Sequence, residues 1–203
     1  MIAIIILTGI LFIVFVFGKA VGDNTENNNN TIIKKPVSNK NVDMLIDFAT
    51  LMAKHIQNNL QIDSPLVFYE QVYLLYFLRD MYAVGKKISE TSRHKILNDL
   101  IITLEYRHKL DYLDNKNDFK NTFSKRYENY MYILLHDKYN FSDNFFDEVF
   151  EYQTAQISSI KNKNQFSNFD PETTCLENNK EELHIKSIVS DNFKLIDAFM
   201  SQQ

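Results

Sequence analysis

The sequence predicts an all-helical protein, on the evidence of its glycine content and its hydrophobic spacing. Only four glycines occur in 203 residues, and Gly9, Gly18 and Gly22 lie near the N-terminus. A β-rich domain needs many more residues that accept positive φ angles in its turns. Apolar residues instead recur at spacings of three and four, the period of an amphipathic helix. We therefore expect residues 41–203 to form one domain, a bundle of about five to six helices.

The first two helices of this bundle have recognisable limits. Apolar positions three and four apart predict a helix over residues 42–60. The next helix is expected to start at Ser64 and Pro65, an N-cap followed by proline in the first turn, and Gly85 can close it. Residues 65–84 are apolar on nearly every side, so this second helix is expected at the centre of the bundle.

Four further helices are predicted by the same spacing. Their expected limits are residues 92–110, 117–137, 142–160 and 181–200. Thr91 is a plausible N-cap for the third helix of the bundle. A polar stretch, residues 161–180, separates the last two helices, whereas short connections elsewhere make consecutive helices antiparallel neighbours.

An uncharged run opens the chain and predicts contact with a lipid bilayer. From Ile2 to Phe17 nearly every residue is Ile, Leu, Val or Phe, and each contributes about −0.3 to −0.6 kcal/mol to insertion. Lys19 can extend its ammonium group to the headgroups. Residues 1–20 are therefore expected to be a retained single-pass transmembrane helix or a cleaved signal peptide. A retained anchor is favoured, because a signal peptide has a basic n-region and a shorter apolar core.

A polar tether is predicted between the membrane segment and the bundle. Residues 21–40 are rich in Asn and bury too little apolar surface to offset the entropy of ordering them. The basic residues that flank the run are Lys19, Lys34 and Lys35, all on its C-terminal side. The positive-inside rule then places the main domain in the cytoplasm. If the run is an export signal instead, the domain lies outside the cytoplasm.

The charge balance is unlike that of a nucleic-acid-binding protein. The chain has 22 Lys and Arg against 26 Asp and Glu, and a net charge of −4, whereas nucleic-acid binding needs a basic face. No cofactor is expected, because no cofactor-binding motif stands out. Basic groups such as Lys86-Lys87, Arg93-His94-Lys95 and Lys125-Arg126 are interpreted as solvated surface. Beside an anionic leaflet they would instead serve as a docking surface, at about 1 kcal/mol per charge.

Glu70 is the strongest single candidate for a catalytic residue. It lies beside Gln71 in the otherwise apolar second helix, and a buried carboxylate with a shifted pKa can mark a site. The alternatives are pairing with an arginine or pointing to solvent. Glu105 and His108 are three residues apart on one helix face, as in di-iron bundles, but such a site needs two Glu-x-x-His pairs and further Glu residues that converge on it. Metal binding there is therefore a weaker hypothesis than solvated helix surface.

Tyrosines of the second and fourth helices are candidates for a protein interface, with core packing as the alternative. Tyrosine is enriched at interfaces. The residues concerned are Tyr69, Tyr73, Tyr76, Tyr127 and Tyr130. Two classes of function follow. The first is a membrane-tethered helical interaction module, such as an adaptor, an inhibitor or an immunity-type protein, that binds another protein. The second is an enzyme with a cryptic site between helices near Glu70. The lack of catalytic motifs favours the first.

Overall fold

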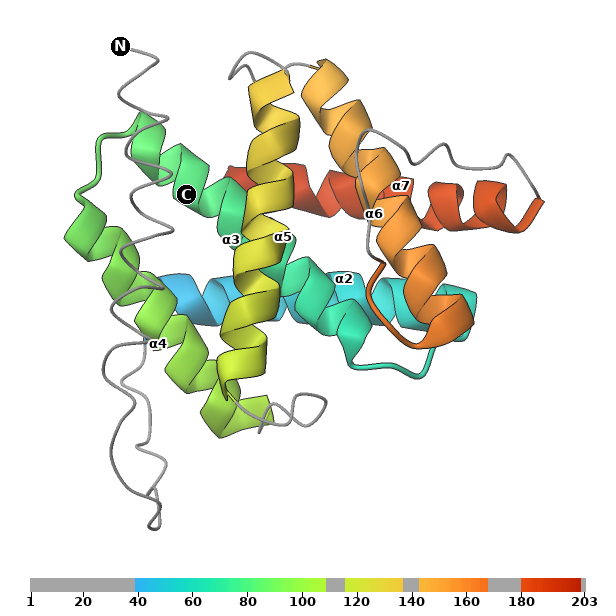
Figure 1. The fold of residues 1–203 in the computed structure, drawn as a ribbon, viewed down its shortest axis with the longest axis horizontal. Helices are drawn as coiled ribbons and strands as arrows, with labels where there is room; N and C mark the ends of the chain where they lie inside the picture. The colour runs from blue at the N-terminus through green and yellow to red at the C-terminus, as the bar shows by residue number, and fades with distance from the viewer. Residues whose placement is uncertain (1–38, 109–115, 137–142, 168–179, 202–203) are drawn as a thin grey trace. The chain divides into compact units, whose positions relative to one another are not determined.

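The computed structural model describes residues 39–108, 116–136, 143–167 and 180–201. Within these ranges the protein has six helices and no strand, so the expected all-helical class is confirmed. The helices are α2 (Lys40–Leu60), α3 (Leu66–Gly85), α4 (Glu90–His108), α5 (Lys116–His136), α6 (Asp143–Lys163) and α7 (Lys180–Met200) (Figure 1).

The predicted membrane segment lies outside the described residues, as does nearly all of the predicted tether. Among the helices that are described, none contains an apolar stretch long enough to cross a bilayer.

Serine side chains cap the starts of two helices. The Oγ atom of Ser64 accepts a hydrogen bond from the backbone nitrogen of Leu66 at 3.3 Å, which confirms the predicted cap of α3. The Oγ atom of Ser89 accepts one from the backbone nitrogen of Ser92 at 3.3 Å. Thr91 is therefore not the cap of α4, because the helix begins at Glu90, ahead of the predicted limit.

Three helices are followed by a non-glycine residue in the left-handed region: Gln61 (φ 54°), Lys87 (φ 58°) and Asn164 (φ 50°). After α3, the backbone nitrogens of Lys87 and Ile88 donate to the carbonyls of Val84 and Ala83, each at 2.9 Å. This is the Schellman arrangement, in which the residue after the helix turns left-handed. The prediction that Gly85 closes this helix is wrong, because Gly85 is still helical and Lys87 takes the left-handed conformation that ends α3.

The chain folds into two compact units, and α2, α3 and α5 each contribute to both. The described part of unit 1 comprises the residues up to Val42 together with those of Ala83–Lys125. In this unit α4 buries an apolar stripe made of Leu97, Leu100, Ile101 and Leu104. The Nδ2 atom of Asn39 donates to Oδ2 of Asp99 at 2.7 Å, which fixes the start of α2 to α4.

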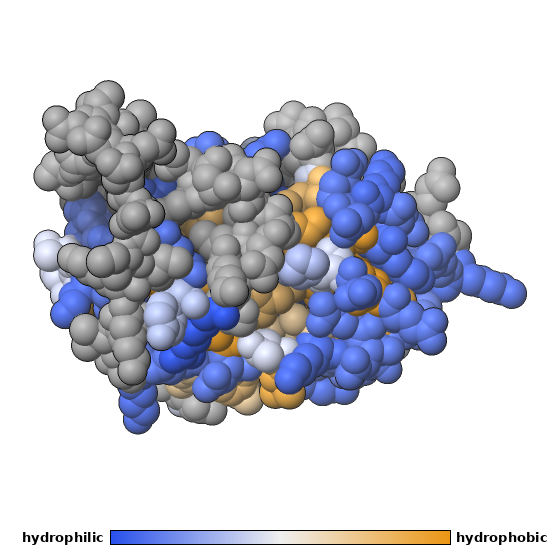
Figure 2. All heavy atoms as spheres, turned by 90° about the horizontal axis from the view of Figure 1, so that it is seen from below, coloured by the Kyte–Doolittle hydropathy of each residue, from blue (hydrophilic) through white to orange (hydrophobic). Residues whose placement is uncertain are grey.

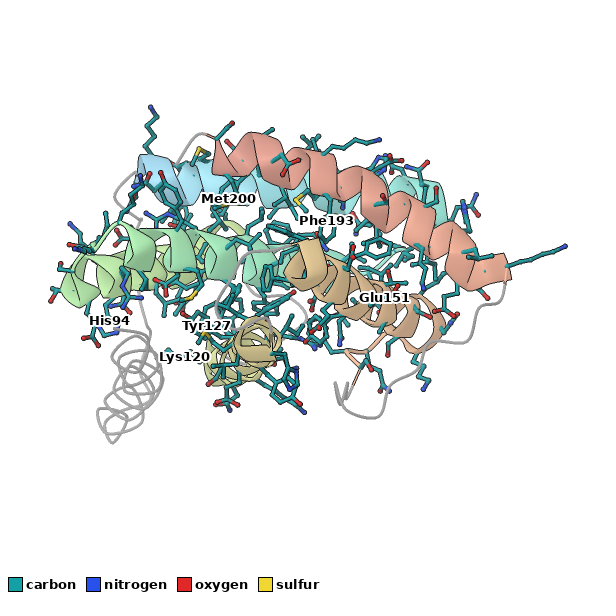
Figure 3. All side chains as sticks on the ribbon, turned by 90° about the horizontal axis from the view of Figure 1, so that it is seen from above. His94, Lys120, Tyr127, Glu151, Phe193 and Met200 are labelled. Carbon is teal, nitrogen blue, oxygen red and sulfur yellow. The ribbon has the colours of Figure 1, made fainter. Side chains whose placement is uncertain are left out.

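Unit 2 comprises Asp43–Tyr82 and the described part of Arg126–Gln203. Within it, α3 lies between the α2 and α7 pair on one side and α5 on the other (Figure 3). Phe48 of α2 meets Phe199 of α7 edge to face, with ring centroids 5.4 Å apart. Asn192 of α7 donates to the carbonyl of Met52 at 3.2 Å. The order of these two contacts along the helices makes α2 and α7 antiparallel.

Helix α6 packs against α7 in the same unit. Phe150 and Phe193 meet edge to face at 5.8 Å, and the Nζ atom of Lys186 lies 2.9 Å from a carboxylate oxygen of Glu151. Figure 3 shows Phe193 and Glu151 on the two helices.

Helix α3 is the central element of the core, as predicted. Every residue from Tyr69 to Met81 is buried, so the helix is covered around its whole circumference. This is why its sequence is apolar on nearly every side. It also means that any polar side chain in this stretch must find its partners inside the protein.

Candidate functional site

Glu70 lies near the start of this buried stretch and is 0% exposed. Its Oε1 atom accepts hydrogen bonds from the hydroxyl of Tyr130 at 3.0 Å and from Nε2 of Gln153 at 2.9 Å. Its Oε2 atom lies 3.2 Å from Nε of Arg126. The carboxylate therefore connects α3 with α5, which carries Tyr130 and Arg126, and with α6, which carries Gln153.

Arg126 is also buried, and each of its three nitrogens has a partner. Nε faces Glu70, Nη1 donates to the hydroxyl of Tyr152 at 2.6 Å, and Nη2 donates to Oε1 of Gln156 at 2.7 Å. The Phe166 ring centroid lies 4.5 Å from Cζ of Arg126, within the range of a cation–π contact. We refer to Glu70, Arg126, Tyr130, Tyr152, Gln153 and Gln156 as the polar cluster.

The electrostatics of the polar cluster favour a neutral tyrosine beside a charged pair. Burial lowers the pKa of Arg126, but the Glu70 carboxylate and the Tyr152 hydroxyl outweigh this effect, so the pKa lies above its ordinary value. Burial, followed by Glu70, raises the pKa of Tyr152 to about 12. The same two causes raise the pKa of Tyr130 well above its ordinary value. Both tyrosines therefore keep their protons at neutral pH, beside the ion pair of Glu70 and Arg126.

The chain that follows α6 turns back and covers the polar cluster. It reverses at Asn164, and the backbone nitrogen of Ser167 then donates to Oε1 of Gln156 at 2.9 Å. Phe166 lies on the guanidinium of Arg126, and its ring centroid is 6.1 Å from that of Tyr73. The ion pair is therefore enclosed by the residues after α6 as well as by three helices.

A second buried polar contact lies further along α3. The hydroxyl of Tyr127 donates to Oδ2 of Asp80 at 2.7 Å. The rings of Tyr127 and Tyr130 pack on Phe77 with centroids 5.3 Å and 5.2 Å away. Figure 3 shows Tyr127 where α5 approaches α3.

The structure places the five candidate interface tyrosines in the core. Tyr69, Tyr73, Tyr76, Tyr127 and Tyr130 are all buried, with exposed fractions of at most 3%. Two of their hydroxyls bond to carboxylates inside the chain, as described above. In this conformation the five tyrosines pack between helices and present no surface to a partner. This is the core-packing role that was the alternative to a protein interface.

The weak metal candidates find no companion ligands among the described residues. Glu105 is half-buried, and the side chain of His108 lies outside what the structure describes. In the described ranges, no three side chains of His, Cys, Asp or Glu come together in a group that could hold a metal ion.

The sequence interpretation missed Arg126 and its partners on α6. Lys125-Arg126 was interpreted as a solvated basic pair, which is wrong for Arg126, since only Lys125 is exposed. A signal was present, because Arg126 is seven residues after Phe119 and four before Tyr130, on the apolar stripe of α5. Gln153 and Gln156 occupy the apolar stripe of α6 in the same way.

The polar cluster holds Glu70 in a fixed position inside the protein. A general base must reach the proton that it abstracts, whereas Oε1 of Glu70 already accepts two hydrogen bonds from the chain and Oε2 lies in an ion pair with Arg126. A buried ion pair adds little net stability but penalises packing arrangements that separate its charges. The cluster is therefore suited to fixing the register of α3, α5 and α6. No protein-family model, curated protein or solved structure matches this chain.

Proposed function

We propose that this chain is a membrane-tethered helical module that binds another protein. Residues 1–20 serve as a retained membrane anchor, residues 21–40 as a tether, and residues 41–203 as the helical domain. An adaptor, an inhibitor or an immunity-type protein would have this organisation. The charge balance of the anchor flanks supports a domain on the cytoplasmic side.

The observation that carries the proposal is that the buried carboxylate of Glu70 is already bound by side chains of the protein itself. The competing hypothesis is an enzyme whose site lies near this residue. Such a site needs a carboxylate that meets a substrate, but Glu70 is 0% exposed and its partners are Tyr130, Gln153 and Arg126. The catalytic candidate Glu70 thus has its partners within the protein, which supports a binding role for the outer surface.

The outer surface has exposed leucines at which a crosslinking group can be placed to detect a partner. Most of the described surface visible in Figure 2 is hydrophilic, with apolar residues showing between the polar ones. In unit 2, Leu51 of α2 and Leu183 of α7 are 51% and 54% exposed. Single exposed leucines are ordinary on a protein surface, so they serve here as probe positions.

Site-specific photocrosslinking in native membranes tests the proposal. A photoreactive residue at Leu51 or Leu183 should give one discrete adduct, and excess unlabelled protein should compete it away. Lys163, which is exposed at the end of α6 and therefore on neither labelled helix, is the control position. If every position gives only diffuse crosslinks that excess unlabelled protein does not reduce, the chain has no specific partner and the proposal is wrong.

The enzyme alternative has its own discriminating variant. Glu70→Gln keeps the size of the side chain and removes its charge. If this variant loses a cellular function while Arg126→Met of equal stability retains it, Glu70 acts chemically and the alternative is correct. If both variants lose function in proportion to lost stability, Glu70 is structural.

A further inference from the structure

We propose that the turn between α3 and α4 docks on an anionic lipid surface, with the side chains of Lys86, Lys87 and Lys95 on the headgroups and Ile88 in the interface. This inference rests on the membrane anchor of the proposed function, and it names a second contact with the same bilayer. We refer to residues 85–95 as the basic turn.

The basic turn combines exposed positive charge with an exposed apolar side chain. All residues from Gly85 to Ser92 are exposed, and Ile88 is 47% exposed. Residues 85–95 contain four basic residues and one acidic residue, although the chain as a whole has a net charge of −4. Arg93 is buried, whereas Lys86, Lys87 and Lys95 are exposed, and the single carboxylate of these residues, on Glu90, lies 3.9 Å from His94.

Backbone hydrogen bonds make this turn suitable for insertion into an interface. The nitrogens of Lys87 and Ile88 already donate to carbonyls of α3, and the nitrogen of Ser92 donates to the Ser89 side chain. Unpaired backbone groups are costly in an apolar medium. Since these nitrogens are hydrogen-bonded within the turn, the Ile88 side chain can approach the acyl chains while these backbone N–H groups keep their partners.

The chain connectivity brings the basic turn near the bilayer. The Asn39 to Asp99 hydrogen bond at 2.7 Å fixes the end of the tether to α4, the helix that begins in the basic turn. Nine residues separate Glu90 from Asp99, which is about 14 Å along a helix. An unstructured tether over residues 21–40 has a root-mean-square length of about 25 Å. The anchor would thus hold the basic turn at a high effective concentration beside the membrane.

These features favour lipid over other anionic partners. Ile88 lies next to two lysines, which is the amphipathic composition that binds at a lipid interface. Each lysine near an anionic surface strengthens binding about fivefold. Nucleic-acid binding needs a wider basic face than three lysines supply.

Fluorescence of a labelled full-length chain in vesicles tests the proposal. An environment-sensitive dye is attached through Ile88→Cys in a Cys175→Ser background, and the control label is attached through Leu183→Cys. We expect a blue shift of the Ile88 label in vesicles that contain phosphatidylserine and none in pure phosphatidylcholine. High salt should reverse the shift, because it screens the lysines.

Charge variants identify the residues responsible. Lys86→Gln with Lys87→Gly removes both charges, and glycine keeps the left-handed turn at position 87. This pair should lower the docked fraction relative to the undocked fraction about 25-fold. Lys54→Gln with Lys163→Gln makes the same change of net charge at exposed positions elsewhere and should leave the shift intact.

The possible outcomes separate docking from anchoring. Equal responses of the two labels, or a response independent of phosphatidylserine, would overturn the lipid proposal. So would a shift produced only by a soluble polyanion, which would indicate an acidic macromolecule as the partner. Resistance to alkaline extraction reports the anchor separately. If the chain is extracted yet the Ile88 label still responds to phosphatidylserine, docking is correct and the anchor of the proposed function is wrong.

Discussion

Replacing Arg126 by methionine should show how strongly the buried polar cluster depends on its charged pair. Arg126→Met removes the cation that lies 3.2 Å from Glu70 and leaves the carboxylate at a position that is 0% exposed. Breaking one side of a buried pair costs about 3–5 kcal/mol. Because a domain is stabilised by only about 5–15 kcal/mol, this loss is a large fraction of the total.

The double variant distinguishes a real ion pair from two independent buried polar groups. Glu70→Gln alone should cost a similar amount, because it leaves the guanidinium without an anion. In the variant that combines Glu70→Gln with Arg126→Met both charges are gone, so it should be no less stable than either single variant. The resulting interaction energy is about 3 kcal/mol.

Urea denaturation followed by circular dichroism gives the required free energies of unfolding, provided that the slope with urea is unchanged. Lys125→Met is the matched control, because Lys125 is exposed beside Arg126 in the sequence, and its effect should stay within about 0.5 kcal/mol. Strictly additive single effects would refute the reasoning, since they would mean that Glu70 and Arg126 do not interact in the folded state.

Three further predictions concern the core, the alkaline limit and the domain limits. Leu75→Ala or Leu78→Ala should each cost about 2–5 kcal/mol in thermal or urea unfolding, because both leucines are buried, whereas Lys54→Ala should have little effect. The Tyr152 pKa of about 12 exceeds the ordinary 10.0, so between these pH values only the unfolded phenol ionises. Stability should therefore fall with rising pH above 10, by roughly 1.4 kcal/mol per pH unit for this group, and Tyr152→Phe should flatten the slope. Finally, residues 41–203 alone should give a helical, cooperatively melting circular dichroism spectrum, and a strand-dominated spectrum would contradict the domain assignment.

The sequence predicted the helices and the burial of α3 because both depend on local periodicity. Spacing of apolar residues sets the helix limits, and an apolar circumference requires burial. The partner of Glu70 was not predictable in the same way. Periodicity shows which face of a helix is buried, but it does not show which neighbouring helix that face meets. The pairing of Glu70 with Arg126 depends on how α3, α5 and α6 pack, and this appears only in three dimensions.

The span of the polar cluster along the chain bears on how this protein folds. Glu70 is 60 residues from Tyr130 and 83 residues from Gln153, and its carboxylate bonds to both. Closing such long loops is entropically costly and slows folding relative to local helix formation. Interactions that form after the rate-limiting step mainly slow unfolding. The carboxylate of Glu70 therefore finds its partners only when α5 and α6 have packed on α3. If this happens after the rate-limiting step, the polar cluster mainly lowers the rate of unfolding.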